Sequence, residues 1–294
     1  MKTPIIMVAV SLAFVFFAAN NVIAQVDTTN SSTSEVYVIT TYDGGEFVGR
    51  IISQDAKEVL METTDRGQVS IPKYQIKKMT ALKAGEMSAS GAYVPEEVFA
   101  TRYFISTNGL PIEKGESYAL WNIFGPEFHF GVSENLSVGI MTSWFAIPII
   151  GTVKYTIELG EKTNLGIGTL LGTGSWAVPD FGLALPFAAL TYGGRRSNIS
   201  VSGGYGAIWT NGNSNGSALF SIAGMSKVGK KVSLVFDSFI VSSQNNGSGW
   251  AILVPGIRLQ HRSDKAFQFG FGAFVIDGEL IPAPIPMLQW FKKF

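Results

Sequence analysis

The chain has 294 residues, of which 15% are charged and 46% hydrophobic, and its 22 basic and 22 acidic residues balance to a formal net charge of zero. This balance removes the electrostatic case for nucleic acid as a partner. Because the sequence contains no cysteine, it excludes a disulfide scaffold, a cysteine-ligated metal, a thiol nucleophile and a lipidated N-terminal cysteine.

The N-terminus predicts a secretory signal peptide over residues 1–24. Lys2 is followed by an apolar region over residues 5–19, and Ala24 supplies a small residue at the expected cleavage point. An uncleaved N-terminal anchor is the alternative interpretation. Residues 25–34 are rich in serine and threonine, so they predict a linker.

Residues 35–83 predict a small separate domain. They contain 14 charged residues, seven of each sign, whereas the 196 residues from Phe99 onward contain 25. Asp43, Gly44 and Gly45 form a tight-turn signal, and Gly49 predicts a sharp bend inside a strand. Short strands are expected over residues 36–42, 46–53, 58–62, 68–71 and 75–79.

This segment resembles the small SH3-like or LSm-like barrels in its Asp43-Gly44-Gly45 turn, in Gly49, and in Ile71-Pro72 ahead of Gln75-Ile76. LSm relatives bind RNA, but this segment is charge-balanced, is expected to be exported and lacks a pair of nucleotide-binding motifs. We therefore expect a periplasmic accessory module with a protein or peptide partner, or a purely structural domain. Residues 84–98, which are small and polar and include Pro95, predict a second linker.

Residues 99–294 predict a transmembrane antiparallel β-barrel. The mean hydropathy of the chain is +0.24, yet no apolar run after residue 24 is long enough for a membrane-spanning helix. Such a composition is typical of a barrel, whose strands offer lipid only every second residue. About twelve strands are expected, or ten if the first hairpin does not cross: 101–106, 117–132, 136–145, 149–159, 165–178, 181–193, 198–210, 217–228, 232–242, 250–261, 267–276 and 286–294.

The period-two pattern of these strands predicts which side chains face lipid. Phe267, Phe269 and Phe271 alternate with Gln268 and Gly270, and successive side chains of a strand point to opposite faces. Bulky side chains are therefore expected outside, and small, polar or charged ones in the lumen. The charged or titratable candidates for the lumen are Arg102, Glu127, His129, Lys154, Glu158, Asp237 and Arg258.

The expected turns differ in length and character. Those at residues 133–135, 230–231 and 263–265 are tight and charged, whereas residues 211–216 and 244–249 read as looser loops rich in asparagine and glycine. Short turns at one end and longer loops at the other are typical of outer-membrane barrels.

The chain ends on Trp290, Phe291 and a terminal Phe294. This ending resembles the assembly signal of bacterial outer-membrane barrels, which implies the barrel assembly machinery as a partner. It departs from the usual form at Lys292 and Lys293. The stretches 131–139 and 221–228 resemble a family of exported Bacteroidota barrels, which supplies no catalytic residues to transfer.

No catalytic, cofactor-binding or metal site is predicted. His129 lies two residues from Glu127 on one strand face. The simplest interpretation is that the two residues form a hydrogen-bonding pair in the interior, rather than an acid/base or metal pair. His261, the other histidine, reads as a polar rim residue.

The leading hypothesis is therefore a bacterial outer-membrane protein that acts as a narrow pore or a largely filled structural body, with its N-terminal domain in the periplasm and outer-membrane lipid around the barrel. Interior charges of both signs would narrow such a lumen. The alternatives are a barrel hydrolase acting on lipid or peptide, which would need a nucleophile, a histidine and an orienting group brought together, and a soluble periplasmic all-β binding protein.

Overall fold

The computed structural model describes residues 35–63, 65–82, 93–242, 249–276 and 279–294, without the side chains of residues 282 and 283. The chain divides into a smaller unit that ends at Pro95 and a larger unit that runs from Glu96 to Phe294. The predicted signal peptide, the first linker and most of the second linker lie outside the described residues. Within the described part, no helix is both long and apolar enough to cross a membrane.

The smaller unit is a five-stranded antiparallel sheet in the order β4-β3-β2-β1-β5. Its buried core consists of Ile39, Val59, Met61 and Ile71. Gly49 lies where a side chain would collide with the backbone of the neighbouring strand, since an added Cβ would come within 2.0 Å of the Glu62 carbonyl oxygen. The strands are β1 Val36–Thr41, β2 Glu46–Gln54, β3 Glu58–Thr63, β4 Gly67–Pro72 and β5 Ile76–Ala81, with a 3-10 turn, η1, at Lys73–Gln75.

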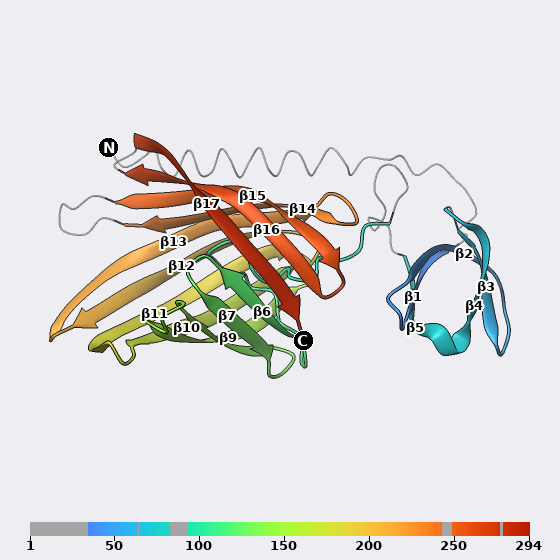
Figure 1. Ribbon diagram of the computed structural model, residues 1–294, viewed down its shortest axis with the longest axis horizontal. Helices are drawn as coiled ribbons and strands as arrows, with labels where there is room; N and C mark the ends of the chain where they lie inside the picture. The colour runs from blue at the N-terminus through green and yellow to red at the C-terminus, as the bar shows by residue number, and fades with distance from the viewer. Residues whose placement is uncertain (1–34, 64, 83–92, 243–248, 277–278) are drawn as a thin grey trace. The chain divides into compact units, whose positions relative to one another are not determined.

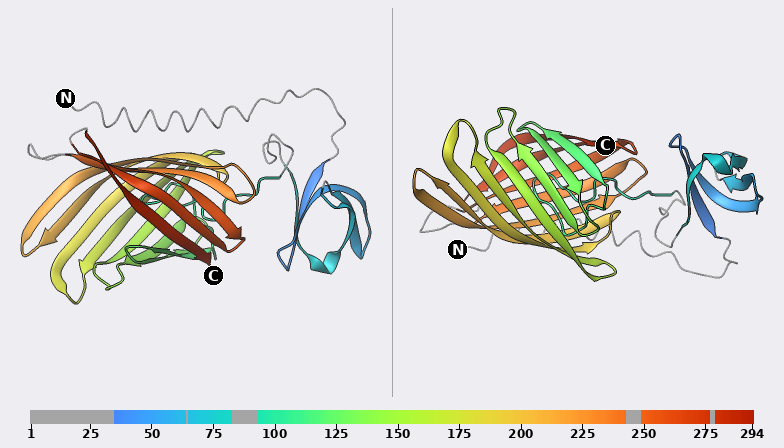
Figure 2. Two further views of the ribbon diagram at one scale, coloured as in Figure 1. Left: turned by 45° about the horizontal axis from the view of Figure 1, so that its top comes forward. Right: turned by 90° about the horizontal axis from the view of Figure 1, so that it is seen from below.

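The larger unit is a closed barrel of twelve antiparallel strands, β6 to β17, in which β17 pairs with β6 (Figures 1 and 2). This confirms the predicted all-β fold class and the count of twelve rather than ten. The strands are β6 Ser117–Asn122, β7 Pro126–Gly131, β8 Leu136–Thr142, β9 Ile149–Gly160, β10 Thr163–Gly174, β11 Val178–Gly193, β12 Ser197–Thr210, β13 Asn213–Lys227, β14 Val232–Val241, β15 Trp250–Arg262, β16 Lys265–Ile276 and β17 Glu279–Lys293.

Two errors in the predicted strands offset each other. Residues 101–106 do not form a strand of the barrel. The single strand expected over residues 117–132 is instead the hairpin of β6 and β7. The chain reverses at Gly125, which has a φ of +158° and no room for a Cβ, because that atom would lie 1.9 Å from the Thr142 carbonyl oxygen.

The turns join the strands at two ends of the barrel, which we call the C-terminal end and the far end. The C-terminal end, where β17 finishes, carries the turns at residues 132–135, 161–162, 194–196, 228–231 and 263–264. The loop predicted at residues 211–216 is wrong: β12 and β13 meet in a two-residue turn at Asn211 and Gly212, and residues 213–216 continue β13. Hydrogen bonding across the hairpin outweighs the local preference of asparagine and glycine for loops.

The outer face of the barrel is apolar and exposed. Val153 and Tyr155 are 46% and 49% exposed, whereas Lys154, between them on β9, is buried. Phe271 is 53% exposed while its neighbours Gly270 and Gly272 are buried. The predicted alternation therefore holds on these strands, with large side chains pointing outward.

Candidate functional site in the barrel lumen

The C-terminal half of the lumen is filled by residues 96–112, which we call the inserted segment. Apart from one bridge between Arg102 and Thr107, it forms neither helix nor strand. It enters and leaves at the C-terminal end, because Arg195, in the turn between β11 and β12, donates hydrogen bonds to the carbonyl oxygens of both Val98 and Pro111. Most of its residues between 97 and 112 are buried.

Side chains of the barrel wall satisfy the backbone of the inserted segment. An irregular segment cannot pair its own N–H and C=O groups, and buried backbone groups without partners are costly. Gln268 and Gln289 donate to the carbonyl oxygens of Tyr103 and Phe104 at 3.2 and 2.7 Å. The Gly109 N–H donates to the Thr191 hydroxyl at 2.8 Å. The polar side chains of the lumen thus serve as hydrogen-bond partners for the backbone of the inserted segment.

Asp237 on β14 holds the tip of the inserted segment. Its carboxylate accepts hydrogen bonds from the backbone N–H groups of Ile105 and Ser106, at 2.6 and 2.8 Å, and from the Ser106 hydroxyl at 2.6 Å. The side chain is fully buried. Its negative charge is therefore stabilised by three donors of the inserted segment.

Glu97, at the start of the inserted segment, forms a buried charge cluster with the wall. Its carboxylate lies 3.4 Å from Lys227 Nζ and 3.8 Å from Arg258 Nη1, and it accepts a hydrogen bond from the Ser233 hydroxyl. Arg258 also donates to the carbonyl oxygens of Phe99 and Arg102. All three charged side chains are fully buried, so each depends on the others for compensation.

A second cluster joins the inserted segment to β7. Arg102 Nη2 donates to both carboxylate oxygens of Glu127, at 3.1 and 2.9 Å. Asn122 donates to the same carboxylate, and His129 Nε2 lies 3.4 Å from it. The His129 ring stacks on Tyr118 with a centroid distance of 5.0 Å. Glu127 is therefore saturated by partners, while Arg102 Nε is buried with no hydrogen-bond partner.

Lys154 on β9 contacts the part of the inserted segment that leads back from its tip to the C-terminal end. Its Nζ donates to the carbonyl oxygens of Asn108 and Leu110 at 2.9 and 2.8 Å. An ammonium has three N–H donors, so one remains. No carboxylate among the described residues lies within 4.0 Å of Lys154, which leaves this buried cation without a paired countercharge.

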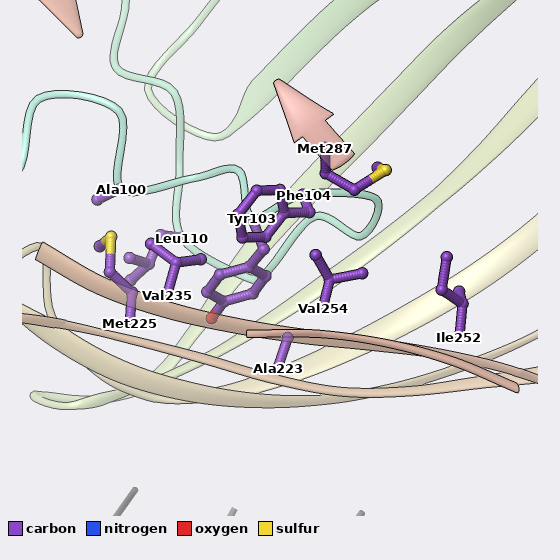
Figure 3. Close-up of a cluster of buried hydrophobic side chains, with 10 residues drawn as sticks. All are labelled: Ala100, Tyr103, Phe104, Leu110, Ala223, Met225, Val235, Ile252, Val254 and Met287. Atoms are coloured by element: carbon purple, nitrogen blue, oxygen red, sulfur yellow. The ribbon is translucent and has the colours of Figure 1, made fainter. Parts of the chain in front are cut away.

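Apolar packing supplements these polar contacts. Tyr103, Phe104 and Leu110 of the inserted segment are buried against wall residues (Figure 3). The wall side of this cluster comes from β13, β14, β15 and β17, as Ala223, Met225, Val235, Ile252, Val254 and Met287. The Tyr103 hydroxyl also donates to Asn198 on β12 at 2.5 Å. The inserted segment is therefore fixed by shape as well as by hydrogen bonds.

A cavity of about 290 Å³ lies beyond the tip of the inserted segment. Its floor includes Arg102, Ser106 and Lys154. Its walls come mainly from β8 to β14 and include the polar residues Ser137, Thr152, Ser202 and Ser221. Large apolar side chains at inward positions of these strands are Met141, Leu170, Leu185, Phe187, Leu219 and Phe239.

The seven residues predicted to face the lumen have different surroundings. Six of them are buried at the contacts described above, namely Arg102, Glu127, His129, Lys154, Asp237 and Arg258. Arg102 belongs to the inserted segment and not to a wall strand. Glu158 lies apart from the other six: it is exposed at the C-terminal end, beside a hollow also lined by Glu96 and Glu113.

Several partners of the inserted segment were not singled out from sequence. Lys227 is the last residue of β13 and falls within the strand expected over residues 217–228, but it was not among the lumen candidates. Glu97 falls in the predicted linker. Gln268 and Gln289 offered a signal, since each is an isolated polar residue at an inward position of an aromatic strand. A search for large polar residues at every inward position would have found them.

The C-terminal end carries a separate ion cluster around Glu116. Its carboxylate accepts a 2.6 Å hydrogen bond from Arg195 Nη2 and lies 2.6 Å from Lys293 Nζ. Burial alone would raise the pKa of Glu116, but the hydrogen bonds and positive charges of Arg195 and Lys293 outweigh it, so the pKa is lowered.

Among the described residues, no serine or threonine hydroxyl is hydrogen-bonded to His129, whose ring contacts Glu127 and Tyr118. No group of three or more potential metal ligands is found in the described part of the chain. The contacts described above hold the inserted segment inside the barrel.

No protein-family model matches the chain, and no curated protein sequence matches it. Among solved structures, a NanC porin is 10% identical with a TM-score of 0.41, over 60% of this chain and 97% of that one. OmpT of Vibrio cholerae, an outer-membrane protein, is 10% identical with a TM-score of 0.38, over 91% and 100% of the two chains. The assignment of a closed barrel comes from the strand pairing described above.

Proposed function

We propose that the protein is a closed outer-membrane barrel whose lumen is blocked at the C-terminal end by the inserted segment. Its outer face would contact lipid, and its N-terminal five-stranded unit would lie in the periplasm as an accessory module. The observation that carries this proposal is the wall of side chains bonded to residues 96–112. A water-filled porin keeps its polar interior for solvent, whereas here the polar interior is occupied by chain.

The apolar outer face supports a membrane location. Residues such as Leu190 and Val201 are 49% and 56% exposed on adjacent strands. In water this surface would be far larger than the apolar patches of soluble monomers, whereas in a bilayer it is stabilised by hydrocarbon. A soluble periplasmic binding protein is therefore disfavoured.

Conductance in planar bilayers tests the closed lumen. We expect the purified wild type to show no sustained current steps, and a variant whose residues 96–112 are replaced by a short glycine-serine linker to conduct. Heat-modifiable migration on a denaturing gel checks that each barrel is folded. If the deletion variant does not fold, Asp237→Ala replaces it, with increased current expected. Wild-type conductance as large as that of a folded variant would overturn the proposal.

Cysteine labelling in whole cells tests the orientation, and the absence of native cysteine makes it clean. Tyr74→Cys places a thiol at a 78% exposed position of the smaller unit, and Asn211→Cys places one in a far-end turn. A membrane-impermeant maleimide should label Asn211→Cys in intact cells, and Tyr74→Cys only after the outer membrane is permeabilised. The reverse result would contradict the proposed orientation.

Two partner assignments follow from this proposal. The terminal strand β17, which ends near Phe294 and closes the barrel against β6, would be recognised by the barrel assembly machinery. The smaller unit would contact a periplasmic protein or peptide. Deleting Phe294 should lower the amount of folded barrel in membranes, measured by heat-modifiable migration; an unchanged amount would count against the first assignment.

A further inference from the structure

The far half of the lumen differs from the C-terminal half in both packing and polarity. Moving along β14 from the C-terminal end, the inward side chain after Asp237 is Phe239, and on β13 the one after Ser221 is Leu219. On β11, Leu185 and Phe187 follow Thr191 and Ala189. Past the tip of the inserted segment the large inward side chains are apolar, although Ser137, Thr152, Ser202 and Ser221 also line the cavity.

This wall does not suit a water-filled channel. Channels for hydrophilic solutes line their interiors with polar residues, whereas concave, mostly apolar cavities with a few convergent polar groups are typical of small-molecule sites. At roughly 30 Å³ for each water-sized group, the 290 Å³ cavity accommodates about ten such groups. That is the size of a medium-length acyl chain.

The floor of the cavity has a hydrogen-bond donor to spare, and the two carboxylates bonded to the inserted segment near it, which do not line the cavity, are already occupied. Asp237 already accepts three hydrogen bonds from the inserted segment. Glu127 is occupied by Arg102, Asn122 and His129. By contrast, Lys154 has one N–H left after its two carbonyl contacts, whereas Arg102, whose unpartnered Nε is itself enclosed by protein, contributes positive charge. Both cations line the cavity.

We propose that this cavity binds a single-chain amphiphile with a carboxylate head group, such as a fatty acid of about ten carbons. The acyl chain would lie against Leu170, Leu185 and Leu219, which would remove it from water. The carboxylate would accept from Lys154, with the positive charge of Arg102 nearby, and would supply the countercharge that Lys154 lacks. This goes beyond the closed-barrel proposal, because a closed barrel needs no ligand.

Equilibrium dialysis of radiolabelled decanoate against the full-length protein in lipid nanodiscs tests the site, with empty nanodiscs as the background. We expect saturable binding of one decanoate per chain. Leu185→Trp fills the cavity and should weaken binding by about tenfold or more. Leu190→Trp makes the same change at an outward position of β11 and should bind like the wild type. Equal binding by Leu185→Trp and Leu190→Trp, or none above background in the wild type, would overturn the site.

The head group is tested separately with decanol and decylamine as competitors of decanoate. Decanoate should bind tightest and decylamine weakest, because the floor offers donors and positive charge. Lys154→Met should weaken decanoate binding while leaving decanol competition unchanged. If Lys154→Met does not fold, the order of the three head groups on the wild type decides. Decylamine binding as tight as decanoate would refute the carboxylate assignment. Bilayer conductance plays no part in this test, so the two proposals can fail independently.

Discussion

The two units of this chain differ in the polarity of their interiors. In the five-stranded sheet, Val59 and Met61 are fully buried, and charged side chains lie outside. In the barrel, Asp237 and Arg258 are fully buried while Tyr155 is half-exposed. The same period-two rule governs both units, so the difference lies in which face meets the surroundings. One unit has an apolar core and a polar outer face, and the other has an apolar outer face and a polar inserted segment within, as the proposed membrane location requires.

The largest expected loss of stability comes from Asp237→Ala, which removes a buried carboxylate of the barrel. The substitution leaves two half-buried backbone N–H groups and one half-buried hydroxyl of the inserted segment without an acceptor, at a cost of roughly 3–6 kcal/mol for the three. Urea unfolding of the protein refolded into lipid vesicles measures the loss. Asp180→Ala, at an exposed position of β11, is the control. A loss of stability as small as that of the control would mean that these polar contacts do not hold the inserted segment in the lumen.

In the smaller unit the decisive change is the loss of apolar volume. Met61→Ala should destabilise the sheet by about 2–5 kcal/mol, because it opens a cavity in the core. Limited proteolysis of the full chain should show faster cleavage within residues 35–82. The heat-modifiable migration of the barrel should be unchanged. A parallel loss in the barrel would show that the two units do not fold independently.

A charge on the outer face sharpens the comparison. Val153→Lys lies near the middle of β9 and should cost about 2–4 kcal/mol of stability in a bilayer. Leu159→Lys makes the same change next to the turn at the C-terminal end and should cost about 0–1 kcal/mol. Urea midpoints in vesicles give both values. Equal costs would indicate that this face does not cross hydrocarbon.

The smallest effect is expected at the C-terminal end, where the ion cluster around Glu116 reaches the surface through Lys293, whose side chain is 32% exposed. The pKa of Glu116 is lowered in the folded state, so its contribution is present above its unfolded pKa and is lost as pH falls through the folded value. The stability gap between wild type and Glu116→Gln should therefore be constant near neutral pH and shrink in acid. After screening, it should stay below about 1 kcal/mol. A gap that grows as pH falls would contradict this sign.

Much of the barrel follows from local pattern. The alternation of Phe267, Phe269 and Phe271 with Gln268 and Gly270 places β16, and similar alternation gives most other long strands nearly to their ends. The exception is β17, which begins at Glu279, seven residues before the predicted start. Period two is reliable here because an apolar outer face and a filled lumen enforce it along each strand. The short hairpin of β6 and β7 was missed because its reversal depends on Gly125 fitting against Thr142.

The inserted segment could not be predicted in the same way. Arg102, Tyr103 and Ile105 alternate as a strand does, and a short window offers no other signal. What decides their conformation is contact with residues far along the chain, such as Asp237 and Gln268. The sequence pattern identified most of the charged residues that lie in the lumen. It did not show that these charges bind the inserted segment, because the local sequence of that segment predicts a strand.

The inserted segment begins and ends at one mouth of the barrel and leads directly into β6. The cylinder is sealed where β17 meets β6, over the pairs from Tyr118 to Asn122. The residues that block the lumen are thus covalently attached beside the seam itself. The wall can wrap around them as its last edge joins, and no free chain end has to be passed through a finished ring.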